Sequence, residues 1–237
     1  MNFKKAGIFR RISEESEQQE VQNDSGGMLA VWGSPGSGKT VTAVKIAKML
    51  SAKKKNVILL LCDMTAPMLP CICSPDELEC ERSLGNILAA ARIGENLIKH
   101  NLVTLKRSNY LTMLGLLKGE NEYSIPPFTE KQAIELLDGL RQIAPYVIVD
   151  CGSYIANDIL SAVALMEADS VLRLANCDLK SISYFSSQLP LLKDAKWDAD
   201  KQYKVAANDL RSMQQAVGGY IQAVYPYEEA VVLICNA

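Results

Sequence analysis

Residues 33–40 fit the phosphate-binding pattern G-x-x-x-x-G-K-[ST]. They are Gly33, Ser34, Pro35, Gly36, Ser37, Gly38, Lys39 and Thr40. Glycines let such a loop turn its backbone N–H groups toward phosphate oxygens. A lysine at this spacing reaches the β- and γ-phosphates, and the following threonine hydroxyl ligates Mg²⁺. The pattern therefore predicts a site for a nucleoside triphosphate with Mg²⁺.

The segments on either side of this loop agree with that interpretation. Residues 28–32 are apolar and predict a short buried strand, and the residues after the loop follow helical spacing, with one apolar face made by Ala43, Ile46, Ala47 and Leu50. The alternative is a Gly/Ser-rich turn that carries Lys-Thr by chance. The order strand, glycine loop, helix favours the phosphate loop because it places the phosphates at a helix N-terminus.

Two acidic residues follow apolar runs and are candidates for the chemistry at the γ-phosphate. Asp63 follows the run at 57–61, where a carboxylate can orient the attacking water or hold Mg²⁺; a simple loop cap is the alternative. Asp150 ends the run at 146–149, which is the Walker B arrangement for a metal-supporting carboxylate. Gly152 follows, and its backbone N–H can approach the γ-phosphate.

The rest of the chain predicts alternating strands and helices. We expect further strands at 110–114, 171–174, 203–207 and 220–224, and helices near 84–91, from 95, after Thr129 with its capping-box partner Gln132, and after Asp178. The proline- and cysteine-containing segment 64–82 is expected to be a loop that senses the nucleotide. Such alternation indicates an α/β fold with a doubly wound, mostly parallel sheet and helices on both faces.

Composition favours one domain. The chain has 237 residues, of which 49% are apolar, and we expect a polar N-terminal leader at 1–27 and a single P-loop domain at 28–237. The 25 basic and 27 acidic residues nearly cancel, so no overall field attracts nucleic acid, and direct DNA binding stays open. No apolar run is long enough for an integral membrane segment, which favours a cytoplasmic protein.

The seven cysteines favour reduced thiols over a disulfide framework, because several lie within or beside apolar runs. Cys71, Cys73 and Cys80 could bind a metal. Ordinary packing is the preferred interpretation, since a fourth ligand at regular spacing is missing and His100 is the one histidine in the sequence.

Taken together, these motifs resemble the MinD/ParA group of P-loop ATPases, including the pilus-positioning members of the TadZ/CpaE type. The resemblance spans residues 28–237 and is carried by the phosphate loop and by the segments 60–63, 83–88, 147–152, 168–172 and 226–227. It implies an ATPase that uses ATP and Mg²⁺ and whose two subunits close around the nucleotide. By position, it also implies that Asp63 positions the attacking water and that Asn208 and Pro226 border the adenine.

Two departures from that group bear on function. The group usually carries a second lysine near the start of the phosphate loop, which reaches the partner subunit's nucleotide; this chain has Ser34 there. The loss of a cation opposite the transferred phosphoryl group predicts slow hydrolysis. It also means that the main sequence feature indicating a nucleotide-dependent homodimer is missing. The chain also ends at 231–237 without the basic amphipathic helix of membrane-binding members.

The resulting hypothesis is a slowly hydrolysing ATPase that switches contacts with an unidentified protein partner during partitioning or positioning of DNA, conjugation or pilus machinery. A catalytically weak nucleotide-binding scaffold and a P-loop phosphotransferase are the alternatives. GTP preference is disfavoured because no N-K-x-D follows a late strand.

Overall fold

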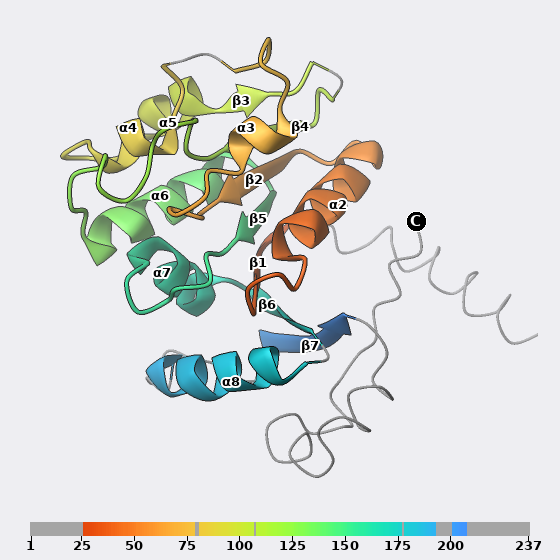
Figure 1. The fold of residues 1–237 in the computed structure, drawn as a ribbon. Coiled ribbons are helices and arrows are strands. Elements are labelled where there is room, and N and C mark those ends of the chain that lie inside the picture. The colour runs from red at the N-terminus through yellow and green to blue at the C-terminus, as the bar shows by residue number, and fades with distance from the viewer. Residues whose placement is uncertain (1–25, 79–80, 107, 177, 193–200, 208–237) are drawn as a thin grey trace, which may run out of the picture.

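The computed structural model describes residues 26–78, 81–106, 108–176, 178–192 and 201–207. These residues form a seven-stranded sheet with helices on both faces (Figure 1). The strands are β1 (Gly27–Gly33), β2 (Val57–Leu61), β3 (Val103–Thr104), β4 (Leu111–Leu114), β5 (Tyr146–Asp150), β6 (Ser170–Asn176) and β7 (Gln202–Ala207). Their order in the sheet is β3-β4-β2-β5-β1-β6-β7, and every neighbouring pair is parallel except β3 and β4. The predicted doubly wound α/β fold is confirmed.

The helices separate into two layers. They are α2 (Lys39–Ala52), α3 (Leu69–Ile72), α4 (Leu84–Leu88), α5 (Glu95–Asn101), α6 (Glu130–Ile143), α7 (Ile159–Glu167) and α8 (Leu179–Gln188), followed by the 3₁₀ helix η1 (Leu189–Leu192). Apolar residues of α2 and α3 pack on one face of the sheet with alternate residues of the central strands. Those of α4 to α8 pack on the opposite face. The central strands are therefore covered on both sides, which explains their continuous apolar sequences.

Strand register brings the candidate site to one edge. Asp150 is aligned with Val31 of β1 on one side of β5 and with Leu61 of β2 on the other. The phosphate loop, Asp63 and Gly152 follow the carboxyl ends of these three strands directly. In open parallel sheets, ligands bind at this edge. The central strand trio β2-β5-β1 thus assembles three segments that lie far apart in the sequence.

Several predicted elements are confirmed, and some details differ. The capping box of α6 is present: Thr129 Oγ1 accepts from the N–H of Gln132, and Gln132 Oε1 accepts from the N–H of Thr129. The segment 64–82, predicted as a loop, contains the short helix α3. Strand β3 and helix α7 were not predicted. The expected strand at 220–224 and the leader residues 1–25 lie outside the described residues.

Within the part of the chain that the structure describes, no helix has both the length and the apolar character needed to cross a membrane.

Candidate functional site

The phosphate loop joins β1 to α2, and two of its glycines are needed for its shape. Gly36 and Gly38 have φ angles of 77° and 81°, in the left-handed region that other residues rarely adopt. Gly38 is also the N-cap of α2 and offers no side chain, so the helix N-terminus is open to an anion. The conformation of the loop therefore depends on glycine where the sequence pattern requires it.

Gly33 is fixed by close packing rather than by its φ angle. A Cβ atom at this position would lie 2.1 Å from the carbonyl oxygen of Leu174 and 2.9 Å from Ser37 Oγ. The next residue, Ser34, is fully buried, and its hydroxyl lies 2.7 Å from the hydroxyl of Ser181 in α8. Position 34, where the resembling group carries a lysine, thus faces the interior of this protein.

Lys39 extends from the first turn of α2 into the cavity. Its Nζ donates to Ser153 Oγ at 2.7 Å and to the carbonyl oxygen of Ser34 at 3.5 Å. Burial lowers the pKa of Lys39, whereas the carboxylates of Asp150 and Asp63 act in the opposite direction. The ammonium group is therefore bonded to two neutral oxygen atoms and lies near two acids, and a charged oxygen of an anion is a stronger acceptor than either neutral oxygen.

Asp150 lies at the bottom of the site. The residue is 2% exposed, and its Oδ1 has no hydrogen-bond partner although it is buried. Burial raises the pKa of Asp150 to about 6, partly offset by a hydrogen bond with Thr40 and by the charge of Lys39. A buried carboxylate oxygen without a partner is costly unless a ligand satisfies it.

The donors around Asp150 fit Mg²⁺. A threonine hydroxyl and nearby carboxylates are hard oxygen ligands, and Mg²⁺ at nucleotide sites needs only one or two protein ligands because phosphate and water supply the rest. The described residues contain no cluster of three or more His, Cys, Asp or Glu side chains that could hold a metal by themselves. The residues present thus fit a magnesium ion that arrives with a nucleotide.

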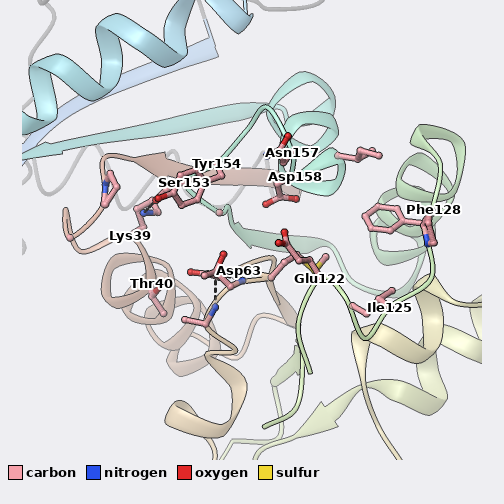
Figure 2. Close-up of a pocket in the computed structure, with 18 of the residues that line it drawn as sticks. Lys39, Thr40, Asp63, Glu122, Ile125, Phe128, Ser153, Tyr154, Asn157 and Asp158 are labelled. Carbon is pink, nitrogen blue, oxygen red and sulfur yellow. Dashed lines mark hydrogen bonds between the residues drawn. The ribbon is translucent and has the colours of Figure 1, made fainter. Parts of the chain in front are cut away.

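Asp63 stands at the end of β2, and its carboxylate has a structural role as well. Its Oδ1 accepts from the N–H groups of Thr65 and Ala66, both at 2.9 Å. This turn holds the carboxylate at the cavity that the phosphate loop lines (Figure 2). Asp63 can therefore both cap the loop and orient a water molecule. Its Oδ1 accepts the hydrogen bonds of the turn, and the side chain still lines the cavity.

Gly152 lines the same cavity, but its N–H already has a partner. It donates to Ser161 Oγ at 2.8 Å, and Ser161 in turn is bonded to Asp158, the N-cap of α7. The N–H of Gly152 is thus directed to α7 in this structure and not toward a phosphate. Asn208 and Pro226, predicted to border the adenine, lie outside the described residues.

The cavity is larger than a phosphate site and includes residues that the sequence analysis did not select. Its volume is about 630 Å³. Opposite the phosphate loop it is lined by the segment 125–128, and Tyr154, Asn157 and Asp158 form a third side (Figure 2). Of these residues, Asp158 could have been found from the sequence. Asp-x-x-Ser at 158–161 is a helix N-cap pattern, and it follows Asp150 by only a short loop.

Four of the seven cysteines lie within the described residues. Cys62, Cys73 and Cys151 are buried, Cys71 is exposed, and all four are free thiols. Burial raises the pKa of both Cys62 and Cys151, which favours the protonated thiol over the nucleophilic thiolate. Cys80 lies outside the described residues, so the proposed Cys71, Cys73 and Cys80 metal set is not tested as a whole.

Comparison with solved structures finds the same fold in other proteins. The ParA family ATPase from Chlorobium tepidum superposes with a TM-score of 0.65 at 16% identity, over 83% of this chain and 81% of that chain. The septum site-determining protein MinD from Pyrococcus horikoshii, complexed with Mg-ADP, gives a TM-score of 0.60 at 12% identity, over 80% and 76%. The chain has the MinD/ParA-type P-loop fold.

A third solved structure with a similar fold is a synthase. Cobyrinic acid a,c-diamide synthase from Mycobacterium smegmatis, with bound ADP and magnesium, matches with a TM-score of 0.61 at 18% identity, over 86% of this chain and 83% of that chain. Among family models, a domain of unknown function, DUF3846, matches residues 196–237. Comparison with curated protein sequences finds no match.

Proposed function

We propose that this protein binds ATP with Mg²⁺ at the phosphate loop, hydrolyses it slowly, and uses the nucleotide state to change its contacts with a protein partner. One observation carries the proposal. The buried, unpartnered Oδ1 of Asp150 and the ammonium group of Lys39, whose hydrogen bonds are to neutral oxygen atoms, both lie at the N-terminus of α2. A triphosphate with its metal supplies what each group lacks.

Each residue then has a defined task. The backbone of the phosphate loop and Lys39 bind the β- and γ-phosphates, and Thr40 and Asp150 hold Mg²⁺, directly or through water. Asp63 orients the attacking water from the end of β2. When bound, Mg²⁺ neutralises charge on the phosphate oxygens and polarises the γ-phosphoryl group.

Slow turnover is supported by the surroundings of Ser34. Its hydroxyl is bonded to Ser181 inside the protein. Lys39 is the one lysine or arginine among the described residues that line the cavity. A second cation that stabilises the transferred phosphoryl group is worth several powers of ten in rate in enzymes that have one. Without a second cation, hydrolysis is slow, and the protein stays in its ATP-bound state for longer.

A switching role is supported by the kinds of protein that share the fold. They include a MinC:MinD cell division protein complex from Aquifex aeolicus, which matches at 16% identity. By analogy, the partner of this chain is a protein, and the work is partitioning or positioning of DNA, conjugation or pilus machinery in the cytoplasm. ATP binding would also control a second contact, the association of two copies of this chain into a homodimer.

The experiment compares the wild type with Lys39→Ala and with Lys45→Ala, an exposed lysine on α2 that serves as a matched control. Calorimetry with Mg²⁺ is expected to show ATP binding by the wild type and the control, and at least a hundredfold weaker binding by Lys39→Ala. Sedimentation and phosphate release in the same samples report dimerisation and turnover. Absence of ATP binding by the wild type would overturn the proposal, and binding without phosphate release would leave a nucleotide-binding scaffold.

A further inference from the structure

The cavity at the nucleotide site has two ends of different chemistry. At one end, the phosphate loop presents backbone N–H groups and Lys39. At the other end, the segment 125–128, which follows β4, presents isoleucine, two prolines and phenylalanine (Figure 2). The proposed function accounts for the first end only, because a triphosphate with its metal is bound by N–H groups, cations and oxygen ligands and gains nothing from an apolar wall.

The apolar wall is a built part of the fold. Ile125 is 8% exposed and belongs to the core beneath the sheet, and the partly buried ring of Phe128 packs against the same core. The turn before it is tied by a 2.8 Å hydrogen bond from the N–H of Asn121 to Ser124 Oγ. The capping box of α6 fixes the chain after it. Such a preformed apolar surface beside polar groups is typical of a small-molecule site.

The charges at this end are acidic. Glu122, Asp63 and Asp158 line the same part of the cavity, from the loop after β4, the end of β2 and the N-cap of α7 (Figure 2). Both carboxylate oxygens of Asp158 already accept hydrogen bonds from Ser161. Lys39 is the one cation among the described lining residues, and it is used by the phosphates. An anionic ligand would meet like charge here, whereas an ammonium group would meet carboxylates and, beyond them, the γ-phosphate.

We propose that the end of the cavity between the phosphates and Phe128 binds a second, small ligand: a primary amine with an aromatic or aliphatic body. The body lies against Ile125 and Phe128, and the ammonium group lies against the carboxylate of Glu122. The proposal rests on the proposed function only for the position of the phosphates. It adds a ligand that faces the γ-phosphate, which a simple nucleotide switch does not require.

The test uses phenethylamine as the probe and 3-phenylpropionate, of similar size and opposite charge, as the matched control. Binding is followed by ligand-observed NMR with the protein alone and with the non-hydrolysable analogue AMP-PNP and Mg²⁺. We expect the amine to bind in both states and the carboxylate to bind at least tenfold more weakly. Because amine binding is measured without nucleotide as well, failure of AMP-PNP to bind counts against the proposed function alone.

Variants locate the binding. Phe128→Ala is expected to weaken phenethylamine binding about tenfold and Glu122→Gln about fivefold. The controls are Tyr123→Ala, on the same loop but outside the cavity lining, and Glu81→Gln, an exposed acid elsewhere; both should leave binding unchanged. The proposal is overturned if the amine does not bind, if the carboxylate binds equally well, if Phe128→Ala and Glu122→Gln bind like the wild type, or if AMP-PNP displaces the amine. Displacement would indicate that the nucleotide base occupies the wall.

Discussion

The hydroxyl groups of Ser34 and Ser181 lie 2.7 Å apart inside the protein and join the phosphate loop to the first turn of α8. Ser181 Oγ also accepts from the N–H of Asn176, at the end of β6. Because that bond uses Ser181 as an acceptor, its hydroxyl hydrogen is available to Ser34. The residue that stands in place of a lysine thus supports the loop from within.

The first prediction concerns this serine pair. Ser34→Ala leaves a buried hydroxyl of Ser181 with one partner fewer and is expected to lower the free energy of unfolding by about 1 kcal/mol. Urea denaturation of Ser34→Ala, Ser181→Ala and the double variant measures the coupling, which should also be about 1 kcal/mol. ATP affinity should change less than threefold in Ser34→Ala. Strictly additive effects of the two variants would show that the pair does not interact.

The second prediction separates the two roles of Asp63. Asp63→Asn keeps a side-chain oxygen that can accept from the N–H groups of Thr65 and Ala66, so the turn and ATP binding should be retained. The loss of charge removes the group proposed to orient the attacking water, and phosphate release should fall at least tenfold. Calorimetry and a phosphate-release assay on the same preparation check this. Unchanged release would reduce Asp63 to a loop cap.

The third prediction concerns pH. Burial raises the pKa of Asp158 to about 6 from the ordinary value of 3.8. The folded protein therefore retains a proton on Asp158 over a range in which the unfolded chain has released it. Folding stability from this group is highest below about pH 4 and is lost as the pH rises through 6. A shift of about two pKa units corresponds to at most about 3 kcal/mol.

Asp158→Asn tests this pH dependence, because asparagine is also a good N-cap and does not titrate. Without nucleotide and Mg²⁺, the variant should lose less stability than the wild type between pH 4.5 and 7.5, measured by urea denaturation. Some dependence should remain, since the pKa of Asp150 is raised to about 6 by burial as well. Asp138→Asn, which changes an exposed acid on α6, is the control. A profile identical to wild type would exclude Asp158 as its source.

The fourth prediction concerns the close packing at Gly33. A methyl group there would collide with the backbone carbonyl of Leu174, which cannot move without displacing β6. Gly33→Ala should lower the free energy of unfolding by about 2 kcal/mol or more and weaken ATP binding. Gly94→Ala is the matched control, because an added Cβ there meets nothing within 4 Å and the φ angle is −115°. Equal stability of the two variants would contradict the packing argument.

Much of the fold followed from periodicity. Strand β2 is an unbroken apolar run because helices cover it on both faces, and α6 carries a capping box and one apolar face. Helix α7 was missed because it is apolar almost all round, so its sequence has no contrast between faces. Strand β3 has two residues, too few for any period, and owes its existence to pairing with β4.

The sequence alone determined the phosphate loop, because G-x-x-x-x-G-K-[ST] specifies local backbone geometry, and it placed Asp63 and Asp150 at strand ends. Only the tertiary structure decided what surrounds them. The inward direction of Ser34 depends on α8, the contact of Lys39 with Ser153 depends on the loop after β5, and the wall at 125–128 depends on the loop after β4. These contacts join segments that are distant in the chain, so their geometry is set by strand order and register rather than by local pattern.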